Sequence, residues 1–159
     1  MKRLLLMRHA KSDYPAGLSD HDRPLNRRGR LASALMGAWL READMLPDLA
    51  LVSSAARAEE TWERMKLETP AERLKSLYLA DACTLLEAAR QAPDNAETLL
   101  ILAHQPGLEE CADRLLDGER IEGYPTAKIA VLSFDADHWR DAAFGAARLL
   151  AEAAPKQLV

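Results

Sequence analysis

The chain has 159 residues, of which 48% are hydrophobic and 29% are charged, a balance typical of a folded globular protein. This length is enough to bury one substantial hydrophobic core, so we expect a single domain over residues 1–159. The formal net charge of −4 argues against a nucleic-acid partner, because neutralising a phosphate backbone requires a surplus of Lys and Arg. The basic residues must therefore act locally.

The sequence shows no targeting or membrane signal. The apolar run that begins at Leu4 is shorter than the roughly 7 to 15 residues of a signal-peptide core. No stretch reaches the roughly 18 apolar residues that a membrane span requires. Cys83 and Cys111 lack the density and spacing of a disulfide framework or metal site. We therefore expect a cytoplasmic protein with reduced cysteines and no membrane partner.

The apolar pattern alternates between short runs typical of buried strands and the wider spacing typical of helices. The expected elements, in chain order, are strand 3–7, helix 29–42, strand 49–52, helix 56–67, strand 77–79, a short helix around 84–90, strand 98–103, helix 108–116 and strand 128–134. A polar loop over residues 13–26 joins the first strand to the first helix. Residues 139–155 stay open between a helix, which their alanines favour, and an edge strand over 146–150.

Strands that alternate with helices imply right-handed crossovers, a mostly parallel sheet and helices on both faces. We therefore predict an α/β fold. In such sheets, ligands bind outside the carboxyl ends of the strands. The residues that directly follow the strands are thus the candidates for chemistry.

Two arginines and two histidines follow three of the expected strands. Arg8 and His9 come after the first strand, Arg57 after the second, and His104 after strand 98–103. Such a cluster is costly in a core, but it suits a dianionic phosphoryl group, which arginine binds with paired donors. A neutral imidazole can attack phosphorus without a separate base, so we assign this role to His9. His104, just before a helix, would stabilise the transferring oxygens.

Each of these residues also has a structural interpretation. A single histidine at a strand end is more often a surface residue, and an arginine is usually solvated, so only their combination favours a site. A metal site needs three or four ligands, and His21 and His138 lie in different contexts, so we predict no metal and no cofactor. Ser53 and Ser54 could be nucleophiles, although helix capping explains them more simply.

Four segments, in order along the chain, carry a family resemblance. Residues 8–12 read RHAKS, which resembles the Arg-His-Gly signature of the histidine phosphatase superfamily with Ala in third place. The segments that resemble the other motifs are 22–29 (DRPLNRRG), 52–61 (VSSAARAEET) and 102–107 (LAHQPG). The resemblance spans nearly the whole chain and looks closest to the small SixA-type phosphohistidine phosphatases.

The resemblance implies a three-layer α/β/α fold like that of the phosphoglycerate mutases, with a mostly parallel central sheet. It also implies a phosphohistidine intermediate on His9. The residues matched to phosphate contacts are Arg8, Arg57 and His104.

Four further residues are candidates for substrate binding. Arg23 matches a basic residue that lines the pocket in the small branch, and Ser12 and Asn26 lie in the matched segments. Larger relatives carry a glutamate after the third strand as general acid and base, whereas here the best-placed carboxylate is Asp81. Asp81 is equally well interpreted as a helix cap. Because an imidazole leaving group depends less on a positioned acid than an alkoxide does, the missing glutamate favours phosphohistidine over a sugar phosphate.

The sequence therefore predicts a metal-independent phosphatase that hydrolyses phosphohistidine, on a protein partner, through phospho-His9. One alternative is a broad phosphomonoesterase for small phosphorylated substrates, with Asp81 as the acid. Another is a module that binds a phosphoprotein without turnover. Because no insertion long enough to cover the site is evident, we also expect an open pocket that admits a protein surface. The oligomeric state stays open.

Overall fold

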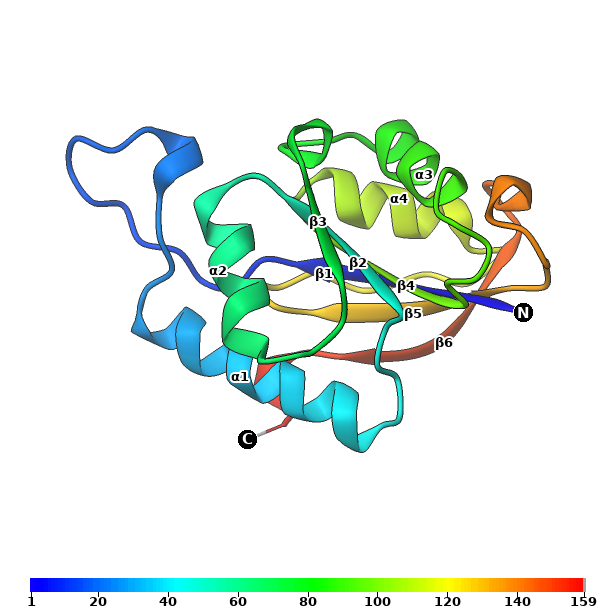
Figure 1. Ribbon diagram of the computed structural model, residues 1–159, viewed down its shortest axis with the longest axis horizontal. Helices are drawn as coiled ribbons and strands as arrows, with labels where there is room; N and C mark the ends of the chain where they lie inside the picture. The colour runs from blue at the N-terminus through cyan, green and yellow to red at the C-terminus, as the bar shows by residue number, and fades with distance from the viewer. Residues whose placement is uncertain (159) are drawn as a thin grey trace.

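Six strands form one sheet with helices on both faces (Figure 1), which confirms the expected three-layer α/β/α fold. The computed structural model describes residues 1–158. Val159, the last residue of the expected domain, lies outside the described residues. None of the helices formed by residues 1–158 is long and apolar enough to cross a membrane.

Most elements lie where the hydrophobic pattern places them. The strands are β1 (Lys2–Arg8), β2 (Leu49–Ser53), β3 (Ala71–Leu74), β4 (Thr98–Ala103), β5 (Ile129–Phe134) and β6 (Ala147–Ala153). The helices are α1 (Arg27–Glu42), α2 (Ala56–Met65), α3 (Ala82–Arg90) and α4 (Gly107–Leu115), with short 3₁₀ turns at Asp20–Asp22, Lys75–Leu77, Trp139–Asp141 and Pro155–Gln157.

The strand order β3-β2-β4-β1-β5-β6 places β2, β4 and β1 side by side. The first four strands of this order run parallel, β5 is antiparallel to β1, and β6 is antiparallel to β5. The sheet is therefore mostly parallel, as expected. Arg8 at the end of β1 lies opposite Ala103 at the end of β4. The chain thus leaves these two neighbouring strands at the same edge of the sheet.

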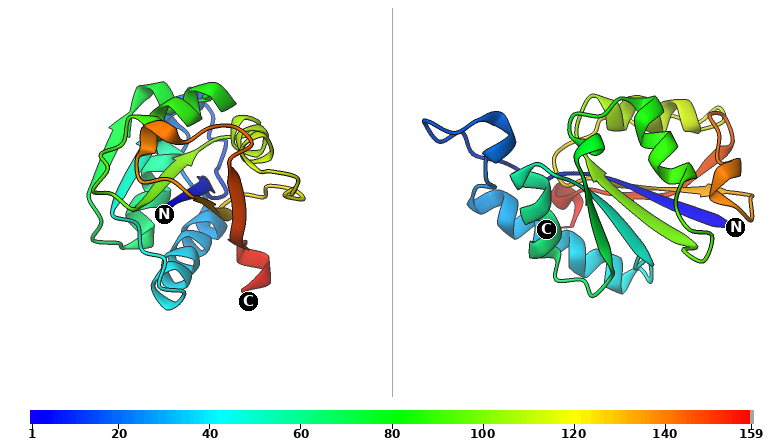
Figure 2. Two further views of the ribbon diagram at one scale, coloured as in Figure 1. Left: turned by 90° about the vertical axis from the view of Figure 1, so that its right-hand side faces the viewer. Right: turned by 45° about the horizontal axis from the view of Figure 1, so that its top comes forward.

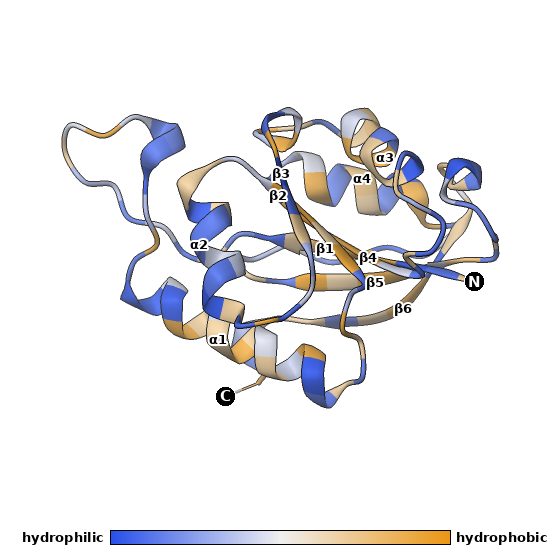
Figure 3. Ribbon diagram, viewed as in Figure 1, coloured by the Kyte–Doolittle hydropathy of each residue, from blue (hydrophilic) through white to orange (hydrophobic). Residues whose placement is uncertain are grey.

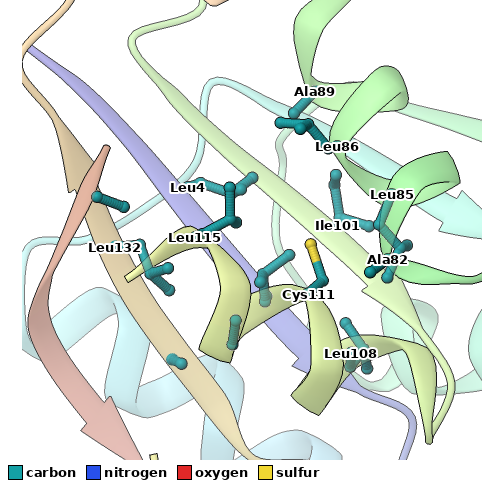
Figure 4. Packing of buried hydrophobic residues seen from close by; sticks show 14 of the residues in the cluster. Leu4, Ala82, Leu85, Leu86, Ala89, Ile101, Leu108, Cys111, Leu115 and Leu132 are labelled. Carbon is teal, nitrogen blue, oxygen red and sulfur yellow. The ribbon is translucent and has the colours of Figure 1, made fainter. Parts of the chain in front are cut away.

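The hydrophobic core consists of one apolar layer on each face of the sheet. Leu4 and Leu6 of β1 pack toward α3 and α4, whereas Leu5 and Met7 pack toward α1 and α2. Figure 2 shows the two pairs of helices on opposite faces, and Figure 3 shows the apolar residues concentrated on the central strands. Figure 4 shows the α3–α4 side from close by. This alternation fixes the register, because a slip of one residue would move every side chain of β1 to the other face.

The third strand lies earlier than predicted. It spans Ala71–Leu74, whereas the expected strand 77–79 is a turn in which Leu79 has φ of +52°. The reason is that β3 is an edge strand that bonds only to β2, and most of its side chains are exposed. It therefore lacks the apolar run of a buried strand. Leu77 is buried in the core cluster that includes α3 and α4 rather than in the sheet.

The C-terminal segment, which the sequence left open, forms edge strand β6. It pairs antiparallel with β5, with Ile129 opposite Ala153. Trp139, in the 3₁₀ turn that precedes β6, is fully buried, and its indole N–H donates to the Ala96 carbonyl oxygen at 2.6 Å. The alanine-rich segment Ala147–Ala153 is therefore an edge strand rather than a helix.

A substitution at Gly37 tests the close packing between α1 and α2. A Cβ at this position would lie 2.3 Å from the Met65 carbonyl oxygen at the end of α2. Replacing a helical glycine with alanine ordinarily stabilises a protein by about 1 kcal/mol. We expect Gly37→Ala instead to lower the free energy of unfolding by about 1–3 kcal/mol, because the two helices must separate. Denaturant unfolding measures this change, and an unchanged or higher value would contradict the close approach.

Candidate active site

Side chains from the ends of β1, β2 and β4 meet at one edge of the sheet. His9 directly follows β1, His104 directly follows β4, and Arg57 lies in the first turn of α2, after β2. The ring centroids of the two histidines are 5.2 Å apart. These side chains line a cavity of about 220 Å³. Its lining residues are Arg8, His9, Lys11, Ser12, Tyr14, Arg23, Arg57, Leu79, His104, Gln105 and Thr126.

His9 is held with its Nε2 nitrogen unprotonated. Its Nδ1 lies 2.8 Å from the Ala10 carbonyl oxygen, which can only accept a hydrogen bond, so the ring proton is on Nδ1. Its Nε2 carries the lone pair and accepts a hydrogen bond from Arg57 Nε at 3.3 Å. The Ala10 N–H in turn donates to Thr61 Oγ1 at 2.9 Å, which fixes the loop. His9 thus has the tautomer that a nucleophilic Nε2 requires.

Asp20 holds Arg57 in place. Arg57 donates to the Asp20 carbonyl oxygen at 2.7 Å and to its carboxylate at 3.1 Å. The same carboxylate accepts hydrogen bonds from the Tyr78 hydroxyl and from Arg23 Nε. The hydrogen bond from Tyr78, together with the charges of Arg57 and Arg23, lowers the pKa of Asp20 to about 2. Asp20 is therefore negatively charged at neutral pH and positions a cation rather than supplying a proton.

Ser53 orients His104. The Ser53 Oγ lies 2.7 Å from His104 Nε2 and accepts a hydrogen bond from the Ala55 N–H at 3.3 Å. A serine hydroxyl has one proton and two acceptor lone pairs, so Ser53 Oγ can donate to His104 Nε2 while it accepts from the Ala55 N–H. When Ser53 donates, His104 carries its ring proton on Nδ1. Ser53 therefore acts on the imidazole ring rather than as a nucleophile.

Two buried polar atoms at this site, Arg8 Nε and His104 Nδ1, have no hydrogen-bond partner among the described residues. Arg8 is anchored by its Nη1, which donates to the Tyr124 carbonyl oxygen at 2.9 Å. A buried polar atom without a partner costs about 1–3 kcal/mol. An oxyanion with several acceptor oxygens would satisfy both donors and offset the repulsion among the arginines. The unpartnered polar atoms and the arginines at this site therefore favour an anion.

Both imidazoles are neutral in the free protein. Burial, together with the charges of Arg57 and Arg8, lowers the pKa of His9 to about 4. Burial and the neighbouring His9 and Arg57 lower the pKa of His104 to about 3. Because the cations also favour an anion, the same environment that keeps His9 unprotonated attracts the group that it would attack.

Ser12 and Arg23, both predicted to bind substrate, line the cavity and lie close together. The Arg23 Nη1 donates to Ser12 Oγ at 2.9 Å. The guanidinium of Arg23 also lies 4.0 Å from the centre of the Tyr14 ring. These contacts hold a third arginine at the cavity wall.

Asn26 and Asp81, also predicted to bind substrate, lie outside the cavity lining and cap helices. Asn26 accepts a hydrogen bond from the Gly29 N–H at the start of α1, at 2.8 Å. Asp81 accepts one from the Thr84 N–H at the start of α3, also at 2.8 Å. The structure thus gives both residues a capping role, because an Asn or Asp before a helix satisfies the free amide groups of its first turn.

Sequence reasoning missed Tyr14, Tyr78 and Asp20. All three lie in loops or short turns that carry no periodic pattern. One signal was available: Asp20 precedes Arg23 by three residues, the spacing of an ion pair on one helical face, and the pair does form at 3.1 Å. The contact of Asp20 with Tyr78 joins residues 58 positions apart, which no local pattern indicates.

A larger hollow, of about 750 Å³, lies between β2, β3 and α3, away from the histidines. Its walls combine Leu51 and Leu74 with the carboxylates of Glu72 and Glu87. Among its described lining residues there is no histidine, lysine or arginine. The smaller cavity at the sheet edge is therefore the candidate active site.

The lowered pKa values of His9 and His104 can be tested in the phosphate-free protein. We expect NMR titration to show His9 and His104 neutral from pH 8 down to about 5, with protonation near pH 4 and below. The unfolded chain protonates these rings near pH 6.5, so the free energy of unfolding should fall as the pH drops from about 6.5 to 4. Titration of His9 near pH 6.5 would contradict the buried, cationic environment.

Comparison with known proteins gives the same family by sequence. The family model described as "Histidine phosphatase superfamily (branch 1)" matches residues 4–78. The phosphohistidine phosphatase SixA of Escherichia coli (strain K12) is 31% identical over 138 residues, which cover 83% of this chain and 85% of that protein. The matched region includes the turn after β1 and the start of α2, where His9 and Arg57 lie.

Comparison with solved structures extends the likeness to the whole fold. A SixA-type protein from Nakamurella multipartitia superposes with a TM-score of 0.88 at 27% identity, over 97% of this chain and 96% of that chain. The protein histidine phosphatase SixA complexed with tungstate superposes with a TM-score of 0.80 at 26% identity, over 99% of each chain. The chain therefore belongs to the histidine phosphatase superfamily, and within it to the SixA-type branch.

Proposed function

We propose that this chain hydrolyses phosphohistidine on a protein, through a phosphoryl group carried transiently on His9. The observation that carries the proposal is the unprotonated Nε2 of His9, oriented by the Ala10 carbonyl and facing Arg57. Support comes from the relative named phosphohistidine phosphatase SixA. The SixA structure that contains tungstate, a tetrahedral oxyanion, supports the assignment of the cavity to a phosphoryl group.

In the first step, the Nε2 lone pair of His9 attacks phosphorus in line with the imidazole of the substrate. The new N–P bond forms while the N–P bond of the substrate breaks, and the leaving imidazole takes that electron pair and a proton from solvent. Imidazole is a much weaker base than an alkoxide, so this step does not depend on a positioned acid. This agrees with the cavity, whose described lining residues include no carboxylate.

In the second step, water attacks phosphorus, its proton passes to a phosphate oxygen, and the N–P bond to His9 breaks. Because Nδ1 keeps its proton against the Ala10 carbonyl, His9 leaves as a neutral imidazole and is ready for another cycle. Arg8, Arg57 and the Nδ1–H of His104 stabilise the negative oxygens in both steps. The free donors of Arg8 and His104 acquire partners at that moment.

The proposed reaction proceeds without a metal. Arg8, Arg23 and Arg57 line the cavity, and their positive charges repel a divalent cation while they supply the charge stabilisation that such a cation would give. We place the reaction in the cytoplasm, because Cys83 and Cys111 are both free thiols, the state that a reducing compartment maintains.

The rim of the cavity supports a protein substrate. Tyr14 and Leu79 line the cavity and are 76% and 57% exposed, so they present apolar surface at its mouth. The loop over residues 13–26 projects from the body of the molecule (Figure 1). These two side chains would provide apolar contacts to a protein whose phosphohistidine enters the cavity.

The substrate preference gives the first functional test. Phosphate release is measured in chelator from a phosphohistidine-bearing protein and from a panel of phosphate monoesters. We expect release mainly from phosphohistidine, and a loss of about 10³-fold or more in His9→Ala, because the nucleophile is removed. An Asp81→Asn variant is the control and should keep its activity. A preference for monoesters, or turnover by His9→Ala at the wild-type rate, would overturn the proposal.

Asp20 gives the second functional test. We expect Asp20→Asn to lower kcat by about 10-fold to 100-fold with a smaller change in KM, because Arg57 loses its anchor and is misplaced against the transferring oxygens. Asp22→Asn is the matched control, since Asp22 lies two residues away and its carboxylate lies 3.6 Å from the half-buried His21 rather than against Arg57. Equal kinetics for the two variants would show that Asp20 does not position Arg57.

A further inference from the structure

A second hollow adjoins the active-site cavity. It measures about 230 Å³ and shares two lining residues, Lys11 and Thr126, with the cavity that contains His9. The remaining lining residues are Arg28, Ala32, Pro125, Ala154, Pro155 and Lys156. The two hollows are therefore adjacent compartments of one surface depression.

Three cations from separate parts of the chain surround this second hollow. Lys11 follows β1, Arg28 lies in the first turn of α1, and Lys156 lies in the C-terminal 3₁₀ turn. Among residues 1–158, no carboxylate lies within ion-pair distance of any of the three. By contrast, Arg30, on the same turn of α1, pairs with Glu60 at 3.7 Å. The hollow thus has positive walls, and the described residues provide no counter-charge to them.

The first turn of α1 contains basic residues that destabilise the helix. Arg27, Arg28 and Arg30 begin this 16-residue helix, and no acidic residue lies in its first turn. The positive end of the helix dipole repels these cations, whereas an Asp or Glu here would be favourable. Folding alone does not account for this choice of residues. An anion held between Arg28 and Lys11 would convert the repulsion into attraction.

Close backbone packing places Lys11 beside the start of α1, while the side chains of Lys11, Arg28 and Lys156 are exposed to solvent. A Cβ at Gly29 would lie 2.1 Å from the Lys11 carbonyl oxygen, and the Asn26 N–H donates to that same oxygen at 3.0 Å. The loop after β1 is therefore in direct contact with the start of α1. Lys11 and Arg28 are presented together by rigid backbone rather than by a mobile loop.

We infer that the second hollow is an anion subsite, and that the substrate carries a second anionic group beside its phosphoryl group. This inference rests on the proposed function and deepens it. On a protein substrate the second group is an acidic side chain close to the phosphohistidine. On a small substrate it is a carboxylate or a second phosphate. Lys11, which lines both hollows, contacts both groups.

The binding test uses two matched series of stable probes that contain one phosphonate group. In the first series an alkyl chain of variable length ends in a carboxylate, and in the second it ends in an uncharged amide. Calorimetry with the wild-type protein gives Kd for each probe. At the chain length that spans the two hollows, we expect the carboxylate to bind about 10-fold more tightly than its amide partner, and we expect this difference to shrink at high salt.

Three variants test which residues cause the tighter binding of the carboxylate probes. Arg28→Ala and Lys156→Ala should remove the preference for the carboxylate and leave the Kd of the amide probes unchanged. Arg27→Ala is the matched control, because Arg27 is a neighbouring arginine of the same helical turn that lines neither hollow. A preference that Arg27→Ala removes as completely as Arg28→Ala would overturn the subsite, since it would reflect general charge alone.

The possible outcomes distinguish a failure of the subsite proposal from a failure of the proposed function. If all phosphonates bind but the Kd values of matched carboxylate and amide probes agree within two-fold, the subsite proposal is wrong and the proposed phosphoryl site stands. If no phosphonate binds, the phosphoryl site itself is wrong, and the subsite with it. Hydrolysis of phosphohistidine peptides that differ by Glu or Gln at a flanking position, beside phosphate esters with and without a second phosphate, then identifies which source supplies the second group.

Discussion

The parallel pairing of β1 with β4, and of β4 with β2, is the constraint on which the site depends. These strands are buried on both faces, so the apolar core determines their register and with it the points at which the chain leaves the sheet. His9 and His104 are neighbours because Arg8 and Ala103 are paired. Burial of the strands therefore also holds Arg8 and Arg57 at one site, although their positive charges repel each other.

The assembled site has a positive charge that attracts an anion. Arg57 is almost fully buried beside two imidazoles, and burial, together with the charge of Arg57, keeps both rings neutral. Asp20, outside the cavity lining, partly neutralises Arg57 and fixes its direction. A phosphoryl group would supply the remaining negative charge and would meet a nucleophile that needs no activation.

Much of this site was predictable because its residues follow strands with a strong signal. β4 is an unbroken apolar run, so His104 after it belongs at the sheet edge. β3 was misplaced because an edge strand with exposed Glu72 and Arg73 carries no such run. From the sequence, Asp81 is equally well interpreted as a helix cap or as a pocket residue. The hydrogen bond that it accepts from the Thr84 N–H shows that it caps α3. The Asp20–Tyr78 contact arises from tertiary folding and has no local pattern.

The measurement that tests the central claim most directly is the mass of the protein after rapid quenching during turnover, under alkaline conditions that preserve phosphohistidine. The account predicts a fraction of molecules heavier by one phosphoryl group, with the added mass on the peptide that contains His9. Phosphate release without any phosphorylated protein, or with the phosphoryl group on another residue, would contradict it.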